Sequence, residues 1–247
     1  MKADPDAQLK LLDLQKLDAA ADQLRHQRAH LPEDTEVSAL DVRRADVLGR
    51  SRDQQIVVDD LTAAQEKADA DVEQVKARRK RDQDRMDQGL IGNPKDLERM
   101  QHELTSLERR IATLEDEELE VMEDLEAAQT ELTAMRNDLA ETEERLAKVT
   151  EARDRRYAEI DAELARIAGE REPVVAAVPA DLLALYDRLR TSKGGVGVAE
   201  LRARQCGGCM LSLDNADLAD IRSKADDEVI RCEQCQRILV RTSESGL

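Results

Sequence analysis

The chain has 247 residues and a formal net charge of −17, and 38% of its side chains are charged. It contains no Phe and no Trp, so its interior has to be built from aliphatic side chains and methionine. A composition rich in Ala, Glu, Leu and Arg is typical of long helices or coiled coils, and the acidic balance disfavours nonspecific binding to nucleic acid or anionic membrane.

The first residues, MKADPDAQLKLLDLQKLD, lack the basic segment and apolar run of a signal peptide. The longest apolar run is VVAAV (174–178), which is far too short to span a bilayer. We therefore expect a cytoplasmic protein with no membrane partner.

Two helices are predicted before residue 88, over residues 6–30 and 33–87. They are separated at HLPED (30–34), because Pro32 cannot lie inside a helix but can begin one. The first helix carries a short apolar seam of Leu14, Leu17, Ala21 and Leu24. The second has a poorer pattern, whose register the sequence alone leaves open: Val37, Leu40, Val47, Val58, Leu61, Ala68, Val72, Val75 and Met86 fit, whereas Arg44, Ser51, Gln54, Gln65, Arg79 and Asp82 interrupt it.

The stretch QGLIGNP (88–94) predicts a turn, and a third helix is expected over residues 95–170. Fourteen of the sixteen positions spaced alternately by three and four from Leu97 to Val149 are apolar. Such a heptad seam requires a partner helix. It continues, after a stutter at Arg153, as far as Ile167. Since the first two helices together match the third in length, we expect them to pack antiparallel to it, with the N-terminus near residue 165.

After REP (171–173) the pattern changes to short elements. We predict a helix over 178–190, a glycine turn and strand over 192–202, a helix over 214–225, strands over 228–232 and 237–240, and a loose tail over 242–247. The fold class is thus mainly α: a long antiparallel coiled-coil hairpin over residues 1–171, followed by a small domain over 172–247. We expect the two parts to have separate cores.

All four cysteines lie in the small domain, with the spacing C-x2-C-x22-C-x2-C: Cys206, Cys209, Cys232 and Cys235. Two CxxC turns brought together by strands can supply a tetrahedron of thiolates, which predicts one structural Zn²⁺ ion. A small domain without Phe or Trp would gain its missing stability from that ion. Disulfides fit poorly with a cytoplasmic chain, and a redox CxxC is typical of a βαβ context. Iron would use the same four thiolates, so the choice between zinc and iron stays open.

Other candidate sites favour ordinary structural interpretations. His26 and His30 share a helical face without an evident acidic partner, SKGGVG (192–197) lacks the Walker order of a phosphate loop, and the acidic run 115–126 lies within the heptad register. No nucleophile and base are paired by any motif. We therefore predict a protein that is not an enzyme.

Basic residues gather in KARRKR (76–81), and the surrounding residues 76–110 hold ten basic and seven acidic side chains. A solvated helix face is the favoured interpretation, and a docking patch for an acidic partner is the functional alternative. Within residues 201–241 seven basic residues balance seven acidic ones. Nucleic-acid binding would therefore depend on a local cluster such as Arg202, Arg204 and Arg231.

Several stretches together resemble one bacterial family, the coiled-coil proteins with a C-terminal C4-type zinc ribbon. They are CGGC (206–209), IRSKADDEVIRCEQCQRIL (221–239), the LPE break, NPKDLERMQHELTSLERR (93–110) and LLALYDRLR (182–190). The resemblance implies a helical hairpin with a zinc ribbon at its base and the four cysteines as ligands. A ribbon knuckle usually has Gly after its second Cys, and this chain has Met210 and Gln236 there. A left-handed conformation at these residues would cost about 1 kcal/mol each.

Members of this family have been linked to transcript or transcription-factor binding and to flagellar regulation. The resemblance therefore implies a regulatory binding protein. Our first hypothesis is an adaptor that recognises a protein partner through the hairpin and the ribbon. The alternative is a regulator that binds RNA or DNA through the ribbon.

Overall fold

The computed structural model describes all 247 residues and divides into two compact units, residues 35–150 and residues 1–34 together with 151–247. The elements in chain order are α1 (Pro5–Ala29), α2 (Pro32–Asp87), α3 (Pro94–Ala176), α4 (Ala180–Ser192), β1 (Val198–Arg202), β2 (Gln205–Cys206), α5 (Asn215–Ser223), β3 (Ile230–Arg231) and β4 (Ile238–Arg241). None of these helices combines the length and the apolar character that crossing a membrane requires.

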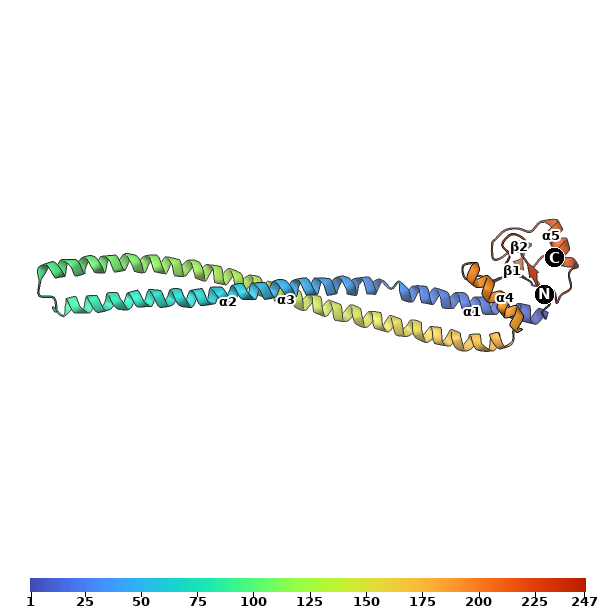
Figure 1. The fold of residues 1–247 in the computed structure, drawn as a ribbon, viewed down its shortest axis with the longest axis horizontal. Helices are drawn as coiled ribbons and strands as arrows, with labels where there is room; N and C mark the ends of the chain where they lie inside the picture. The colour runs from blue at the N-terminus through green and yellow to red at the C-terminus, as the bar shows by residue number, and fades with distance from the viewer. The chain divides into compact units, whose positions relative to one another are not determined.

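In the unit 35–150, α2 and α3 lie side by side as an antiparallel hairpin (Figure 1). The seam predicted from Leu97 is confirmed from Met100 to Val149, where every position is buried or half-buried, whereas Leu97 itself is exposed. One continuous cluster contains Val58 with Leu125, Ala128 and Leu132. This pairing makes each helix the partner that the other's apolar stripe needs.

The register of α2, which the sequence left open, is also clear. Fifteen positions with alternating spacing run from Val37 to Met86, and all except Arg44 are buried or half-buried. Several of these seam positions hold polar residues, whose side chains make specific contacts. Gln54, for example, donates its side-chain amide to the carbonyl of Ala128 at 3.2 Å. The poorer apolar pattern of α2 therefore reflects polar substitutions at the seam and no change of register.

The turn between α2 and α3 is built by helix caps on both sides. Gly89 has a φ of 67°, and its N–H bonds the carbonyl of Met86 while the N–H of Leu90 bonds that of Arg85. These are the two bonds of a Schellman motif, which satisfies the last carbonyls of a helix. On the other side, Oδ1 of Asn93 accepts from the N–H of Lys95 at 3.1 Å, and Pro94 opens α3.

In the other unit, the break between α1 and α2 lies beside the stutter of α3. The hydroxyl of Tyr157 donates to Asp34 at 2.6 Å, and the guanidinium of Arg28 stacks 4.8 Å from the centre of the Tyr157 ring. Leu31, between the two helices, is buried. A ring at the stutter thus fills the space where the N-terminal helix is interrupted.

Helix α3 ends later than the sequence predicted, at Ala176 rather than near residue 170. Pro173 lies within its final turn. The chain leaves the helix through tight bonds three residues apart, from Ala177 to Val174 and from Val178 to Val175. Pro173 has no N–H to donate to the carbonyl of Gly169, so the helical ladder already lacks a bond in this last turn.

The small domain contains a four-stranded sheet in the order β2-β1-β4-β3, with β1 and β4 parallel and the two outer pairs antiparallel. The chain's first residues extend it, since Ala3 N–H bonds the carbonyl of Asp227 and Val229 N–H bonds that of Met1. The N-terminus therefore lies against residues 227–229 (Figure 1).

The expectation of separate cores is wrong. Leu11 and Leu14 of α1 are fully buried in one cluster with Tyr186 of α4 and with Val198 and Val240 of the sheet. A sheet with so few large side chains gains apolar area by packing against α1, which explains why the core is shared.

The tail is also more ordered than predicted. Ser245 is only 2% exposed, and its hydroxyl donates to the carbonyl of Leu201 at 2.9 Å. The carbonyls of Glu244 and Ser245 accept from the N–H groups of Ala203 and Arg204, which form the tight turn between β1 and β2. Both turn residues have positive φ, so the tail supports a turn that non-glycine residues adopt at a cost.

Candidate metal centre

The four cysteines lie on two chain turns with the same hydrogen-bond pattern, which we call the first knuckle (205–211) and the second knuckle (231–237). In the first, Cys206 N–H bonds the carbonyl of Leu211, and Met210 N–H bonds that of Cys206. In the second, Cys232 N–H bonds the carbonyl of Arg237, and Gln236 N–H bonds that of Cys232. The first knuckle follows the β1–β2 turn and the second joins β3 to β4, so the sheet brings them together.

The four sulfurs face one another across the gap between the knuckles. The Sγ atoms of Cys206 and Cys235 are 3.9 Å apart, as are those of Cys209 and Cys232, and all four lie within 4.8 Å of each other. These separations exclude disulfide bonds. A tetrahedron with zinc–sulfur bonds of about 2.3 Å has edges of about 3.8 Å, so the four residues fit a zinc ion.

Backbone N–H groups around the sulfurs favour the thiolate form that a metal requires, but burial opposes it and raises the pKa of both Cys206 and Cys232. N–H groups of Cys209 and Gly208 are directed at the sulfur of Cys206, but its burial dominates and raises its pKa to about 12. Burial acts in the same direction on Cys235, yet the backbone and guanidinium N–H groups of Arg237, with the neighbouring thiols, together lower its pKa to about 7. Metal binding would release the remaining protons, since thiolates are the ligands.

The residue after each second cysteine is in the left-handed conformation, as the resemblance to zinc-ribbon proteins implied. Met210 has a φ of 60° and Gln236 a φ of 65°. Their N–H groups are the donors that close the two knuckles. The chain therefore keeps the glycine conformation without the glycine, at about 1 kcal/mol per residue.

Two residues outside the motif hold the knuckles in place, and the sequence reasoning missed both. Arg237 packs its side chain against Gly208, where an added Cβ would lie 2.8 Å from its Cδ, and donates to the carbonyls of Val196 and Lys193 at 2.9 Å. Gln15 of α1 bonds the carbonyl of Gly195 and the N–H of Gly197. Gly197 has to be glycine, because a Cβ there would lie 2.6 Å from the carbonyl oxygen of Tyr186. The segment 192–197 is thus a glycine turn followed by a strand, as predicted, but it joins α4 to β1 and is not a hairpin turn.

The three arginines suggested for nucleic-acid contact do not form one cluster. In the sheet, Arg231 of β3 pairs with Ile238 of β4, and Ile238 pairs with Val198 of β1. Arg202 lies four residues after Val198, so Arg231 is two strands and four residues away from Arg202. At about 4.8 Å per strand and 3.3 Å per residue, their backbones are roughly 16 Å apart. Each guanidinium is also engaged within the chain: that of Arg202 with Glu244 at 2.8 Å, that of Arg204 with Asn215, and that of Arg231 with the carbonyl of Gln236.

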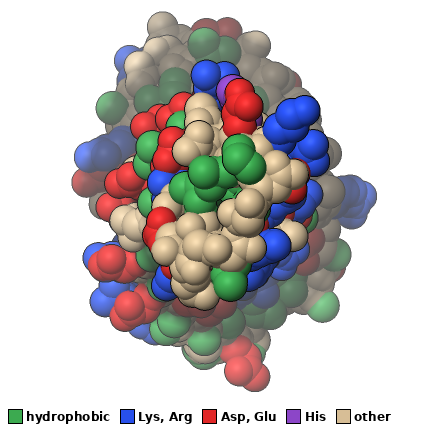
Figure 2. Space-filling model, turned by 90° about the vertical axis from the view of Figure 1, so that its left-hand side faces the viewer, with side chains coloured by type: hydrophobic (Ala, Val, Ile, Leu, Met, Phe, Trp, Pro, Cys, Tyr) green, Lys and Arg blue, Asp and Glu red, His purple; other side chains and the backbone are tan.

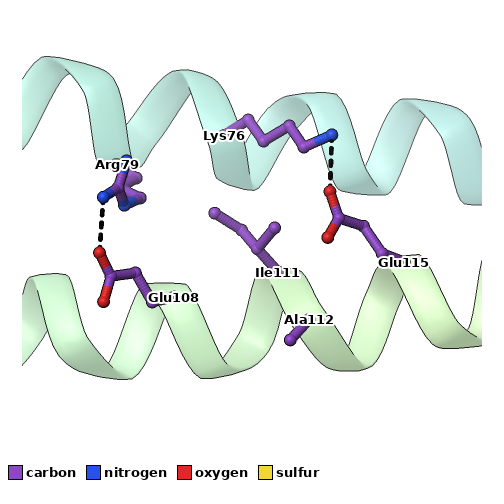
Figure 3. Close-up of a pocket in the computed structure, with 6 residues that line it drawn as sticks. All are labelled: Lys76, Arg79, Glu108, Ile111, Ala112 and Glu115. Carbon is purple, nitrogen blue, oxygen red and sulfur yellow. Dashed lines mark hydrogen bonds and ion pairs between the residues drawn. The ribbon is translucent and has the colours of Figure 1, made fainter.

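A separate groove lies between α2 and α3 in the unit 35–150, with a volume of about 360 Å³ (Figure 3). Ile111 and the small side chain of Ala112 form its floor, and the ion pairs Lys76–Glu115 and Arg79–Glu108 close its two ends. The rings of His26, in α1, and of His30, which caps it, are exposed, and their centres lie 4.2 Å apart. The metal-ligand cluster of the chain is nevertheless the set of four cysteines.

Comparison with known proteins finds a family match for both parts of the chain. The CT398-like coiled coil hairpin domain matches residues 14–194, and the C4-type zinc ribbon domain matches residues 205–239. A protein of Mycobacterium tuberculosis H37Rv is 34% identical over 98% of both chains. A solved structure from Mycobacterium smegmatis is 33% identical, with a TM-score of 0.79 over 98% of this chain and 100% of that one.

The fold also matches CT398 from Chlamydia trachomatis, with a TM-score of 0.63 over 96% of this chain and 98% of that one, at 18% identity. The matching domain covers well over half of the sequence and ends just before the first knuckle. This chain therefore belongs to the CT398-like coiled coil hairpin family, and it carries a C-terminal zinc ribbon domain of the C4 type.

Proposed function

We propose that Cys206, Cys209, Cys232 and Cys235 hold one structural Zn²⁺ ion, and that the protein is a non-catalytic cytoplasmic adaptor that recognises a protein partner. The observation that carries the proposal is the closed set of four sulfurs at tetrahedral separations. With four protein ligands no coordination position is left for water or substrate, which is the mark of a structural zinc site.

The chemistry that zinc supplies is a fixed link between the two knuckles. Hydrogen bonds from neighbouring residues hold the knuckles against the rest of the unit. Those of Arg237 connect the second knuckle to the turn 193–196, and those of Gln15 connect that turn to α1. Holding the ribbon in one shape keeps its exposed side chains, including Met210 (70% exposed) and Leu211 (52%), in fixed positions. Fixed and partly apolar surfaces are what protein recognition uses.

The alternative, a nucleic-acid regulator, has less support. Arg202, Arg204 and Arg231 are separated and already engaged, and both tyrosines are bonded within the chain, Tyr186 being fully buried. Single-strand binding draws on aromatic platforms and on free cationic groups along the phosphates. We expect affinity for generic RNA or DNA no better than about 10⁻⁴–10⁻⁶ M at physiological salt.

Two measurements test the proposal. Metal analysis of the purified full-length chain should give one zinc per chain, and Cys232→Ser should lose it. Affinity capture with the full-length protein, with and without chelator, should recover a partner protein that binds again when both are purified. Less than half a zinc per folded chain, or submicromolar RNA binding that Arg202→Glu with Arg204→Glu abolishes, would contradict it.

A further inference from the structure

The end of the α2–α3 hairpin combines a free apolar side chain with a one-sided group of arginines. Leu90 is 67% exposed and Leu97 36%. In a Schellman motif the residue at the position of Leu90 normally packs against an apolar residue in the last helical turn. Here the candidate positions are held by Arg85 and Asp84, so Leu90 has no apolar neighbour of that kind.

The arginines follow one stripe on each helix. Arg78, Arg81 and Arg85 are spaced by three and four on α2, and Arg99 and Arg110 lie on a stripe of α3 that also contains Glu103. The ion pair between Arg78 and Glu103 places both stripes on the same side of the hairpin. All five guanidinium groups belong to exposed residues. We call this set, with Leu90, the tip surface.

Charge on this side is incompletely balanced. Arg81 lies three residues after Arg78 on α2, and Arg99 lies four residues before Glu103 on α3. Because the helices are antiparallel and Arg78 pairs with Glu103, Arg81 and Arg99 lie at the same level of the hairpin. Arg81 and Arg85 have no ion pair, whereas Arg99 is paired with Asp96 and Arg110 with Glu117, each at 3.8 Å. Figure 2 shows the end of the hairpin, with Lys and Arg mostly along one side of a small apolar patch and Asp and Glu mostly along the other.

We infer that the tip surface docks an acidic, amphipathic segment of a protein partner, whose carboxylates meet Arg81, Arg85 and Arg99 while an apolar side chain covers Leu90. Guanidinium groups bind carboxylates through paired hydrogen bonds, and an apolar contact ringed by polar ones is the ordinary design of a protein interface. The inference rests on the proposed adaptor function and specifies one of its surfaces.

The net negative charge of the rest of the chain supports an acidic partner at the tip surface. Residues 76–110 have an excess of basic groups in a protein with a net charge of −17. An acidic partner is repelled elsewhere and attracted here, which raises its rate of encounter at this end. A single-stranded nucleic acid would find no Phe, Tyr or Trp ring for base stacking in residues 76–110.

The test uses a defined probe, a labelled helical peptide of Glu, Ala and Leu with its Leu residues on one face. Its fluorescence anisotropy is measured with the full-length protein at two salt concentrations. One comparison peptide has Gln in place of Glu, and another has Ser in place of Leu. We expect the acidic amphipathic peptide to bind at least tenfold more tightly than either comparison peptide.

Three protein variants locate the binding. Arg81→Glu, Arg85→Glu and Arg99→Glu together should weaken it at least tenfold, and Leu90→Ser should weaken it severalfold. A matched control changes Arg50, Arg52 and Arg109 to Glu, since these are exposed, lack ion pairs and give the same change of net charge. The control should stay within about twofold of the unchanged protein, and circular dichroism should show that all variants keep their helices.

The inference is overturned if the peptide does not bind, if both triple variants weaken it equally, or if single-stranded RNA or phosphatidylserine vesicles bind the tip more tightly than the peptide. The adaptor proposal is tested apart from this, by zinc content and by chelator-sensitive capture of a partner. A tip variant that keeps zinc and still captures that partner would place recognition on another surface.

Discussion

The hydroxyl of Tyr186 donates a 2.8 Å hydrogen bond to Oδ2 of Asp18 inside the core that α1 shares with α4 and the sheet. Asp18 is 4% exposed, and Nε of Arg171 donates to its other oxygen at 2.7 Å. A buried carboxylate is tolerated when it is paired and hydrogen-bonded in this way. Asp18 thus links α1, the end of α3 and α4 at one point.

Replacing Tyr186 with Phe tests this link. The variant keeps the ring but removes the hydroxyl that donates to Oδ2 of Asp18 and leaves only Nε of Arg190 beside that oxygen, at 3.6 Å. We therefore expect a loss of about 1–3 kcal/mol in the stability of the shared core. Hydrogen exchange of the amides of Leu11 and Leu14 measures it. Tyr157→Phe is the matched control, because it removes a hydroxyl that bonds half-buried Asp34. An equal or larger loss in the control would contradict the prediction.

The same bond predicts a loss of stability at high pH. Burial, followed by the bond to Asp18, raises the pKa of Tyr186 above its usual range. A tyrosine in the unfolded chain ionises near pH 10, so the neutral hydroxyl's contribution is complete below about pH 10 and is lost as the pH rises beyond it.

The chain's two tyrosines make the experiment direct. In Tyr157→Phe only Tyr186 gives a tyrosinate signal, and it should appear together with loss of the shared core rather than near pH 10. Tyr186→Phe should show a flatter decline of stability above pH 10 than the unchanged protein. Ionisation of Tyr186 at its usual pKa, with the core intact, would refute the assignment.

Much of the hairpin could be predicted because its determinants are local and periodic. The seam from Met100 to Val149 is directly readable as a heptad pattern, and Gly89 and Pro94 delimit the turn. The cysteine pairs likewise predict the two knuckles, and the family resemblance implies the left-handed φ of Met210 and Gln236.

The contacts between distant segments could not be predicted in the same way. The shared core depends on α1 meeting α4 and β4, which are more than 160 residues away in the chain. The sequence did contain one signal of this core. Asp18 lies on the same helical stripe as the apolar residues Ala7, Leu11, Leu14 and Ala21, and a charged residue on such a stripe indicates a buried partner for its charge. The fixed tail likewise depends on Ser245 reaching Leu201, which no local pattern encodes.

Zinc removal should loosen more than the ribbon. Since Leu11 and Leu14 pack against Tyr186 and Val198, we expect chelation or Cys232→Ser to raise hydrogen exchange both from about residue 196 onward and in the first turns of α1. Amides of the separate unit 35–150 should keep their protection. Adding zinc back to the chelated protein should restore both regions. Unchanged protection of α1 while the ribbon exchanges freely would show that the shared core does not need the metal.

Engineered cysteines test the hairpin register. The contacts Gln54–Ala128 and Arg78–Glu103 place Val75 and Leu107 at the same level, both at seam positions. Val75→Cys with Leu107→Cys should therefore cross-link within one chain under mild oxidation with the zinc site loaded. Val75→Cys with Leu139→Cys is the matched control, because Leu139 lies 32 residues further along α3, about 48 Å at 1.5 Å per residue. Cross-links found only between chains would indicate an intermolecular coiled coil.

Glu118 is the charged residue that interrupts the seam of α3, and removing it should stabilise the hairpin. Hydrogen bonding with the neighbouring carboxyl group of Asp69, followed by burial and the charge of Asp69, raises the pKa of Glu118. The folded state therefore holds a proton there more tightly than the unfolded state, and the two carboxylates repel each other at neutral pH.

Glu118→Leu should raise the melting temperature at pH 7, since it replaces this repulsion with an apolar contact at a seam position. The gain should shrink as the pH falls, because the unchanged protein recovers stability when Glu118 takes up its proton. Glu120→Leu is the matched control, because Glu120 is exposed and off the seam, so it should change the melting temperature little. Scanning calorimetry at several pH values measures both variants. A Glu118→Leu chain that melts below the unchanged protein at pH 7 would show that Glu118 makes a favourable contact in the hairpin.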